Sequence, residues 1–367
     1  MKLHETYKGT RVLVTGDTGF KGAWLCEWLL MLDADVVGIG LAPNTTPSLF
    51  EKLNLIDRLD HREVDIRDSD AVRELVLEVQ PDIVLHLAAQ ALVRFSYEDP
   101  VDTYATNVMG TVHILDALRA LDKKCAAVFI TTDKCYENRE WLHSYREGDS
   151  LGGHDPYSSS KGACEIAIAS FRKSYFSQPT TGGIAVASAR AGNVIGGGDW
   201  AQDRIVPDCV RALQAGAPIV VRNKVATRPW QHVLEPLGGY LLLAAELWRG
   251  LNEQSAIGAN FQYQSLCDAF NFGPNLQSNR TVESLVHEVL KHWEGEWQDQ
   301  SDSNAPHEAS LLNLSIDKAS HMLGWSPCWG FEQTIQETMD WYIAVESKSA
   351  DSGEIIRGQI SKYADLL

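Results

Sequence analysis

Short, almost wholly apolar runs recur through the first half of the chain, and they constrain its fold more than any other feature. They occupy residues 11–15, 36–39, 83–87, 126–131 and 184–189. A strand with one face in water alternates apolar and polar residues, whereas these runs do not alternate. They are therefore typical of strands that are buried on both faces of a parallel sheet.

Longer segments with a helical pattern separate these runs, at residues 19–33, 69–78, 101–121 and 157–175. Parallel strands need crossover connections of this kind, and the repeated strand–helix–strand order favours helices on both faces of one sheet. We therefore predict an α/β fold with a doubly wound parallel sheet.

A glycine-rich turn follows the first predicted strand and opens the first predicted helix. Glycines in this position permit a tight turn and a close approach of backbone N–H groups to a pyrophosphate, which the helix dipole also favours. The position between strand and helix makes this string far more specific than its spacing alone. The predicted dinucleotide site contains Gly16, Thr18, Gly19, Phe20, Lys21 and Gly22.

The end of the second predicted strand indicates which dinucleotide is bound. An acid there normally holds the adenosine ribose, but residues 38–43 read Gly-Ile-Gly-Leu-Ala-Pro and contain neither an acid nor a base. The lack of Arg and Lys removes the usual contact to a 2′-phosphate and favours NAD over NADP. Asp65, after the third strand, is expected near the adenine amino group, whereas Asp68 fits a helix cap nearly as well.

Tyr157 and Lys161 stand one helical turn apart at the start of a predicted helix. A cation beside a phenol favours the phenolate, so this pair can remove a proton from a sugar hydroxyl. Thr132 follows a predicted strand 25 residues upstream. It would lie at the carboxyl end of the sheet, where open α/β sheets bind their ligands.

These residues belong to a longer series of segments that resembles the CDP-glucose 4,6-dehydratases, a family of extended short-chain dehydrogenases/reductases. The series runs in the family's order from residue 15 to residue 329. Its segments read TGDTGFKG, DIRD, HLAAQALVRFSY, TNVMGTV, TTDKCYENREW, GGHDPYSSSK, RAGNVIGGGDWAQDRIVPD, RPWQHVLEPLGGYLLLA, FNFGP and LGWSPCW. TDKCYEN together with GGGDW is quite specific, because related dehydratases usually carry Thr-Asp-Glu at this strand end.

The resemblance implies a dehydration of CDP-glucose in three steps, with NAD as the cofactor. Tyr157, assisted by Thr132 and Lys161, would deprotonate the hydroxyl on carbon 4 during its oxidation. Water would leave from carbons 5 and 6, and hydride would return to carbon 6. The 4-keto-6-deoxy product would supply deoxysugars for surface polysaccharide such as O-antigen.

The resemblance assigns the elimination to two neighbours of Thr132. Asp133 is expected to protonate the departing hydroxyl, which requires a raised pKa. Lys134 stands where relatives carry a Glu base. It either removes the carbon-5 proton as a neutral amine or only stabilises the enolate while another group moves the proton.

The resemblance also implies the remaining contacts. The cofactor site would add Asp65, Ile66, Leu87, Ala88, Ala89, Gln90, Asn107, Tyr157 and Lys161. The substrate site would contain Gln90, Asn193, Trp200, Arg204, Arg222, Arg228 and His232.

Several of these side chains have alternative roles. Arg204 and Arg228 are the preferred diphosphate contacts because a guanidinium offers two donors in a fork. Exposed salt bridges explain Arg222 and Arg94 equally well. Core packing is the ordinary role for any one of 11 Trp residues, and His86 is expected to be a core histidine.

The character of the sequence changes after about residue 190. A helix is predicted over 233–248, an acidic polar loop over 294–306 and a helix–turn–helix over 317–346. We predict an NAD-binding domain over 1–190 with a returning segment near 226–258, a smaller α/β substrate lobe over 191–350 and a C-terminal tail over 351–367. Relatives use the helices at 101–121 and 157–175 for dimerisation, which implies a homodimer or a higher homo-oligomer.

Composition narrows the remaining functions. The 49 acidic and 32 basic side chains give a net charge of −17, which argues against non-specific nucleic-acid binding. No apolar run approaches the roughly 18–20 residues of a membrane span, and the first residues lack the apolar core of a signal peptide. Seven scattered cysteines without a Cys-x-x-Cys pair favour reduced thiols in the cytoplasm. No cluster has metal-ligand spacing, so no metal is expected.

Two other functions remain open on the sequence alone. The first is a 4-epimerase or a dehydratase that acts on another nucleotide sugar, and Asp133 with Lys134 counts against epimerisation. The second is a non-catalytic NAD-binding regulator, which would not need Thr132, Tyr157 and Lys161.

Overall fold

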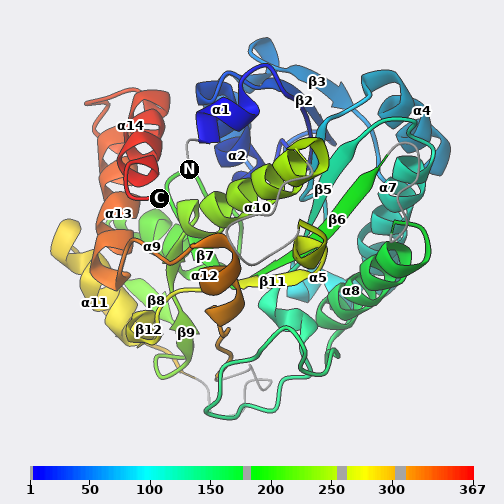
Figure 1. Cartoon of the computed structure of the whole chain (residues 1–367). Coiled ribbons are helices and arrows are strands. Elements are labelled where there is room, and N and C mark those ends of the chain that lie inside the picture. The colour runs from blue at the N-terminus through cyan, green and yellow to red at the C-terminus, as the bar shows by residue number, and fades with distance from the viewer. Residues whose placement is uncertain (1–2, 177–182, 254–262, 302–310) are drawn as a thin grey trace.

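The computed structural model describes residues 3–176, 183–253, 263–301 and 311–367. Seven parallel strands form one sheet in the order β11-β6-β5-β4-β1-β2-β3 (Figure 1). Their bounds are β1 Arg11–Thr15, β2 Asp35–Gly40, β3 Asp60–Glu63, β4 Ile83–His86, β5 Cys125–Ile130, β6 Ile184–Ala191 and β11 Ala269–Phe272. The predicted doubly wound parallel sheet is therefore confirmed.

The burial of each strand follows from its place in the sheet. Every residue of the inner strands β4, β5 and β6 is buried, as their unbroken apolar runs require. The polar strand β3 lies at one edge and pairs only with β2. At the other edge, β11 comes from the second half of the chain and pairs with β6.

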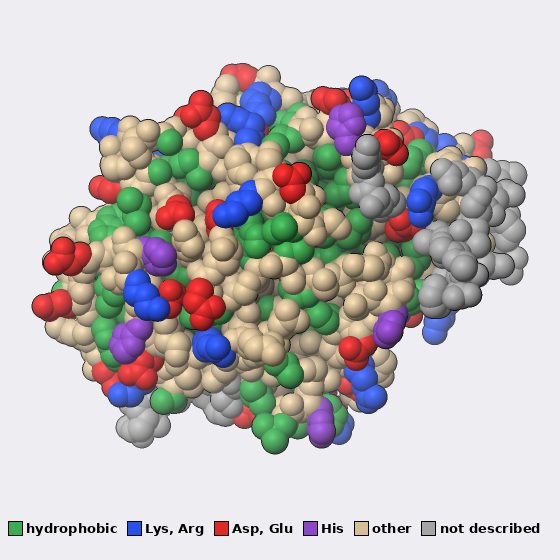
Figure 2. Space-filling view, turned by 60° about the vertical axis from the view of Figure 1, so that its left-hand side comes forward, with side chains coloured by type: hydrophobic (Ala, Val, Ile, Leu, Met, Phe, Trp, Pro, Cys, Tyr) green, Lys and Arg blue, Asp and Glu red, His purple; other side chains and the backbone are tan. Residues whose placement is uncertain are grey.

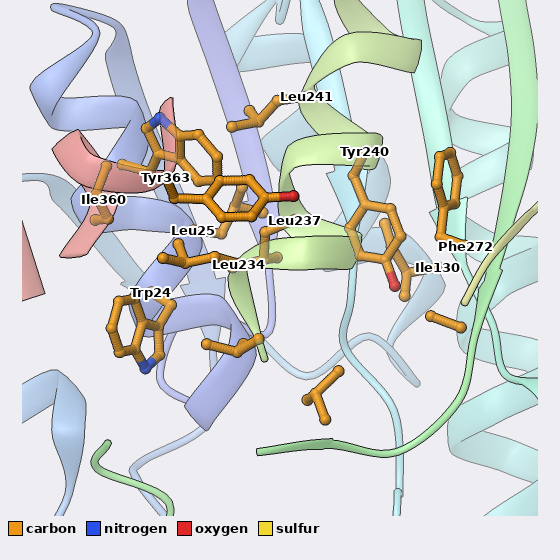
Figure 3. Close-up of a cluster of buried hydrophobic side chains, with 14 of the residues drawn as sticks. Trp24, Leu25, Ile130, Leu234, Leu237, Tyr240, Leu241, Phe272, Ile360 and Tyr363 are labelled. Atoms are coloured by element: carbon orange, nitrogen blue, oxygen red, sulfur yellow. The ribbon is translucent and has the colours of Figure 1, made fainter. Parts of the chain in front are cut away.

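Helices cover both faces of the sheet (Figure 1). One face carries α4 Ser69–Val79, α7 Gly110–Arg119 and α8 Pro156–Ser174 over a core that includes Leu13, Val84 and Phe129. The opposite face carries α2 Phe20–Met31 and α10 Leu234–Glu253, with α1 Leu3–Tyr7 packed against α10. Tyr240 and Leu237 of α10 belong to the larger core on this face (Figure 3).

The predicted helix over 101–121 is divided into three parts. α6 Pro100–Tyr104 comes first, a π-helical turn covers Ala105–Met109, and α7 completes the segment. A π-turn adds a residue to a helical turn and changes the direction of the side chains within it, and such turns are frequent at functional sites. Asn107 lies in this turn and is buried. Helix α5 Val93–Glu98 precedes these segments.

The second half of the chain adds short elements beside the sheet. Three small two-stranded sheets pair β7 Val194–Ile195 with β10 Gln231–His232, β9 Thr227–Pro229 with β12 Asn279–Thr281, and β8 Ile219–Val221 with β13 Trp297–Asp299. The helices of this half include α9 Ile205–Gln214, α11 Val282–His292, α12 Asp317–Leu323 and α13 Phe331–Glu346. The predicted domain boundaries remain predictions, and β11 is a contribution of the later chain to the main sheet.

Two predictions for the second half need correction. The expected loop over 294–306 contains strand β13, because its residues 297–299 pair in parallel with β8; residues 302–306 lie outside the described residues. The expected tail over 351–367 contains helix α14 Ser352–Ala364. Its apolar side chains Ile356, Ile360 and Tyr363 are buried beside α2 and α13, which gives this segment a fixed position.

Among the described helices, none is long and apolar enough to cross a bilayer.

Candidate active site

The glycine-rich turn has the shape that a dinucleotide pyrophosphate requires. Gly16 has a φ of +77°, and a Cβ atom on it would lie 2.8 Å from the backbone nitrogen of Ala88. A Cβ on Gly22 would lie only 2.0 Å from the carbonyl oxygen of Gly16. Helix α2 begins at Phe20 with Gly19 as its N-cap, so no side chain covers its first N–H groups. The turn therefore fits a pyrophosphate at a helix N-terminus.

The segment after β4 is held beside this turn by Asn107. The amide of Asn107 accepts a hydrogen bond from the N–H of Gln90 (2.8 Å) and donates to the carbonyl of Gln90 (3.1 Å). The same amide nitrogen lies 2.9 Å from the hydroxyl of Ser160 on α8. The Gln90 side chain contacts Thr103 and the N–H of Leu92. Asn107 thus joins the 87–90 segment to the helix that carries Tyr157 and Lys161.

The predicted catalytic residues meet where β5 ends and α8 begins. Thr132 donates a hydrogen bond to Asp133 (2.9 Å), and its hydroxyl accepts one from the N–H of Lys134 (3.3 Å). The Lys134 ammonium lies 5.9 Å from the centre of the Tyr157 ring. Thr132, Asp133, Tyr157 and Lys161 are all buried.

Burial dominates the electrostatics of this cluster. It raises the pKa of Asp133 above its ordinary value, against the charges of Lys134 and Lys21. This is the direction that a proton donor at neutral pH requires. Burial also raises the pKa of Tyr157, while a side-chain hydrogen bond with Thr132 and the charge of Arg204 act to lower it.

Lys21 has a place in this cluster that the sequence did not indicate. The glycine-rich motif assigned it to the cofactor, whereas the structure also brings it within electrostatic range of Asp133, Lys161 and Arg204. Burial, with Arg204, lowers the pKa of Lys21 to about 8, and Asp133 opposes this change. Lys134 and Lys21 act on the Asp133 carboxyl group, and Lys161 and Arg204 act on Lys21. The site therefore gathers four basic side chains in a protein of net charge −17.

The predicted phosphate contacts are distributed over the second half of the chain. Arg204 pairs with Asp199 (2.8 Å) and acts electrostatically on Tyr157. Arg222 and Arg94 lie in different parts of the chain, yet both contact the same carboxylate oxygen of Asp203, at 3.0 and 2.8 Å. These contacts are the exposed salt bridges that the sequence offered as an alternative to phosphate binding by the two arginines.

Arg228 and Asn193 lie in two separate segments of the second half of the chain. Arg228 lies in β9, opposite Arg280 in β12. Asn193 is exposed beside Gly192, where an added Cβ would lie 2.9 Å from the carboxylate of Asp133. The loop before β7 therefore passes close to the carboxyl group of Asp133.

Three aromatic candidates belong to the core. His232 is fully buried between the rings of Trp24 and Trp329, at 5.6 and 4.9 Å between centroids. Trp230 is buried and donates to the carbonyl of Arg280 (3.0 Å). Trp200 packs edge-on against Tyr342. These contacts match the ordinary packing role, and His232 has no exposed surface in this structure.

Three other residues that the sequence singled out have structural partners. Asp65 is partly exposed and pairs with Arg67, which lowers its pKa. Asp68 caps α4 by accepting from the N–H groups of Asp70 and Ala71, so the capping role of Asp68 is confirmed. His86 is a core histidine as expected, because Thr15 and Thr111 contact its two ring nitrogens.

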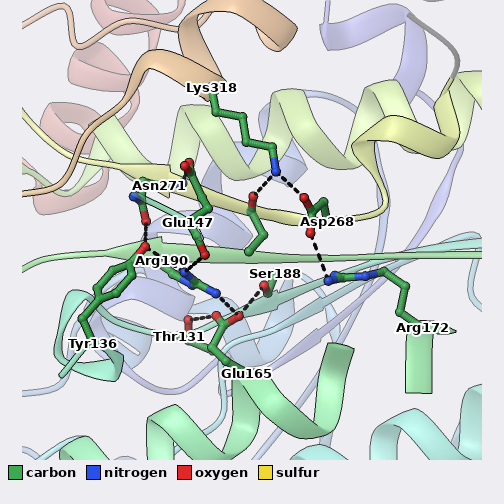
Figure 4. A network of polar contacts seen from close by, with 11 residues as sticks. Thr131, Tyr136, Glu147, Glu165, Arg172, Ser188, Arg190, Asp268, Asn271 and Lys318 are labelled. Atoms are coloured by element: carbon green, nitrogen blue, oxygen red, sulfur yellow. Dashed lines mark hydrogen bonds and ion pairs between the residues drawn. The ribbon is translucent and has the colours of Figure 1, made fainter. Parts of the chain in front are cut away.

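A buried ionic network includes Thr131 and Tyr136, which lie on either side of the 132–135 loop (Figure 4). Glu165, one helical turn after Lys161, accepts hydrogen bonds from Thr131, Ser188 and Arg190. Arg190 of β6 also donates to the hydroxyl of Tyr136 (2.7 Å). Burial acts to raise the pKa of Glu165, but Arg190 and the hydrogen bonds hold it below its ordinary value. The network fixes Thr131 and thereby the start of the catalytic loop.

No sequence motif had indicated this network. Its only signal was an acid and a base, Glu165 and Arg190, in segments otherwise expected to be buried. Among the described residues, no group of three His, Cys, Asp or Glu could hold a metal ion. All seven cysteines are free thiols.

The parallel sheet and its glycine-rich turn define a Rossmann-type protein of the short-chain dehydrogenase/reductase class. More specifically, the chain belongs to the GDP-mannose 4,6 dehydratase family, whose sequence pattern matches residues 13–338. This match, together with the CDP-glucose 4,6-dehydratase relative described next, confirms the resemblance drawn from the motifs.

Individual relatives support this assignment. The chain is 45% identical over 342 residues to a CDP-glucose 4,6-dehydratase of Salmonella typhimurium, and the match covers 92% of each protein. The structure is similar to that of a UDP-glucose 4-epimerase of Thermotoga maritima, with a TM-score of 0.75, 20% identity and coverage of 92% of this chain and 99% of the other. It also resembles a dTDP-glucose 4,6-dehydratase of Bacillus anthracis in complex with NAD, with a TM-score of 0.72, 20% identity and coverage of 92% and 98%. These two structures support the fold alone.

Proposed function

We propose that this protein is an NAD-dependent hydro-lyase that converts CDP-glucose into CDP-4-keto-6-deoxyglucose. The observation that carries the proposal is the 45% identity over 92% of the chain to a CDP-glucose 4,6-dehydratase. The match includes the Thr132-Asp133-Lys134 loop, which the fold brings against Tyr157. Asp133 and Lys134 are the pair that the sequence assigned to elimination of water.

The cofactor site is formed by the glycine-rich turn, the 87–90 segment and the start of α8. NAD held there would supply the hydride acceptor for oxidation at carbon 4 and the hydride donor for reduction at carbon 6. The turn at Gly16 and Gly22 leaves no room for a side chain, so the backbone can approach the pyrophosphate. Asn107 holds Gln90 and Ser160 in place around this site.

Tyr157 is the base for the hydroxyl on carbon 4. Its free phenol has a raised pKa because it is buried, so it needs nearby hydrogen-bond donors and cations to become a phenolate. Thr132 and Arg204 act in that direction in the structure. The cationic nicotinamide and Lys161 are expected to complete the effect.

Asp133 and Lys134 carry out the elimination. The raised pKa of Asp133 keeps a proton available for the departing hydroxyl on carbon 6. The side chain of Lys134 reaches the Tyr157 ring and would therefore lie beside the sugar carbons next to carbon 4. There it takes the carbon-5 proton or stabilises the enolate that forms.

Substrate binding depends on local positive charge, because the whole protein is acidic. We assign Arg204 and Arg228 to the diphosphate, and we keep Asn193, just before β7, and Arg222, just after β8, as further substrate contacts. A guanidinium can bind two phosphate oxygens at once, which suits a dianionic nucleotide sugar.

The proposal is tested by incubating the protein and NAD with CDP-, dTDP-, UDP- and GDP-glucose and measuring product masses. We expect only CDP-glucose to lose the mass of one water. An unchanged mass with an inverted hydroxyl would instead identify an epimerase, and water loss from another sugar nucleotide would change the substrate. Tight NAD binding without turnover would identify a regulator.

We further propose that the protein is a cytoplasmic homodimer. Helices α5, α6 and α8 and the π-turn pack together, and their outer side exposes large apolar side chains. Val101 is 78% exposed, Tyr97 65% and Ile166 61%, and Tyr104 and Met109 extend the same surface. Exposed apolar patches of this kind mark protein interfaces. The predicted dimer helices contain four of these residues.

A further inference from the structure

The end of β2 has no acid of its own, yet a carboxylate occupies the space beside it. A Cβ atom built on Gly40 would lie 2.7 Å from Oδ1 of Asp17 and 3.0 Å from the hydroxyl of Thr18. A Cβ on Gly38 would lie 2.2 Å from Oδ2 of Asp17. Both glycines are therefore required by the side chain of Asp17. The carboxylate comes from the glycine-rich turn rather than from the strand.

Only one of the two oxygens of this carboxylate has a hydrogen-bond partner among the described residues. His61 of β3, which pairs in register with Gly38, contacts Oδ2 of Asp17 through Nδ1 at 2.6 Å. Asp17 has no exposed surface, and its Oδ1 makes no hydrogen bond to the described residues. Burial raises the pKa of Asp17, while the hydrogen bond and charge of His61 oppose that change. A buried acceptor without a partner is uncommon and calls for an explanation.

Thr18, the next residue, is partly exposed and lies beside the same strand end. Its hydroxyl donates to the carbonyl of Leu41 (2.9 Å), which leaves the oxygen lone pairs available as acceptors. The oxygens of Asp17 and Thr18 thus replace the side chain that Gly40 lacks. In Rossmann-type sites this position faces the 2′-hydroxyl of the adenosine ribose.

We infer that Asp17 is the residue that selects an unphosphorylated adenosine ribose, taking the role of the missing strand-end acid. Its buried charge favours a hydroxyl donor at the 2′ position and repels a 2′-phosphate, while Thr18 makes the contact to the ribose. His61 is a positioning residue that holds the carboxylate against Gly38 and Gly40. The inference rests on the proposed use of NAD and specifies how that cofactor is chosen.

The test measures dissociation constants of NAD⁺ and NADP⁺ for the full-length protein by calorimetry, without any substrate. Wild type is expected to prefer NAD⁺. Asp17→Asn keeps the shape but removes the charge, and we expect the preference to fall by about tenfold or more. Asp35→Asn, at the opposite end of β2, removes an exposed charge that pairs with Arg11 and is expected to leave the preference unchanged.

A second variant separates this role from a structural one. Gly40→Asp alone would collide with Asp17 and is expected to weaken both dinucleotides. Asp17→Ala combined with Gly40→Asp returns the carboxylate to the strand and should restore the preference for NAD⁺. Equal weakening of NAD⁺ and NADP⁺ in Asp17→Asn, or failure of the double variant to restore selection, would overturn the inference. A wild type that binds neither dinucleotide would overturn the proposed function with it.

Discussion

Asp133 and Lys134 are adjacent in sequence but differ in environment. Asp133 is buried beneath the loop at Gly192, whereas Lys134 is partly exposed and reaches toward the ring of Tyr157. Burial is what gives the carboxyl group its raised pKa. The more exposed amine is the group that we propose acts on the sugar.

Lys134→Ala tests whether Lys134 acts in the elimination step and not in the first hydride transfer. We expect dehydration to become at least about a hundredfold slower, because a positioned base contributes roughly that much or more. The first hydride transfer should remain, since Tyr157, Thr132 and Lys161 are intact, and should appear as absorbance of the reduced cofactor. Lys291→Ala on the surface of α11 serves as the control. Dehydration at the wild-type rate would remove Lys134 from the mechanism.

At the scale of elements, helix α10 joins the two halves of the molecule. It packs on the sheet, and near its first residue Glu235 accepts hydrogen bonds from the N–H groups of Cys328 and Trp329 and from the hydroxyl of Tyr363. One buried carboxyl group therefore connects α10 to the turn before α13 and to α14. Burial raises its pKa to about 7, against the opposing effect of these hydrogen bonds.

The raised pKa of Glu235 predicts a specific pH dependence of stability. The folded protein holds this proton up to about pH 7, whereas the unfolded chain releases it near the ordinary value of 4.5. The free energy of unfolding should therefore fall as pH rises from about 4.5 to about 7, by up to about 3 kcal/mol from this group.

Urea unfolding at several pH values between 5 and 8 measures this effect. Glu235→Gln cannot titrate, so its free energy of unfolding should fall less over the same range than that of the wild type. The exposed acid of α14 provides a control in Glu354→Gln, which should follow the wild type. Parallel curves for wild type and Glu235→Gln would contradict the prediction.

At the scale of the whole molecule, the net charge is negative, whereas the charge within the proposed site is positive. The chain carries −17, and on the face shown in Figure 2 acidic and basic side chains are interspersed. Long-range attraction of a nucleotide sugar is therefore not expected from the protein as a whole. The cations around Asp133 supply positive potential only within the site.

The proposed dimer can be tested at the same scale. Ile166→Glu places a charge in the apolar surface of α8, and we expect it to shift the protein from dimer to monomer in analytical ultracentrifugation. Leu142→Glu changes a side chain that is even more exposed, at 89%, but lies outside that surface. It should leave the mass unchanged. A wild-type monomer, or a dimer that survives Ile166→Glu, would contradict this interface.

The sequence by itself determined the sheet, and it supplied the local motifs from which the catalytic residues are proposed. Unbroken apolar runs have one stable environment, between two layers of helices, and so they indicated the parallel sheet. A glycine string between strand and helix, and a Tyr–Lys pair one turn apart, are local patterns. Local patterns can be recognised because their geometry depends on neighbouring residues only.

Only the tertiary structure decided the contacts between distant segments. The place of Lys21 beside Asp133, the Glu165–Arg190 network and the burial of His232 depend on packing between elements far apart in the chain. The same holds for Asp17. The sequence showed a strand end without an acid, but only the folded turn brought a carboxylate into the space left by Gly38 and Gly40.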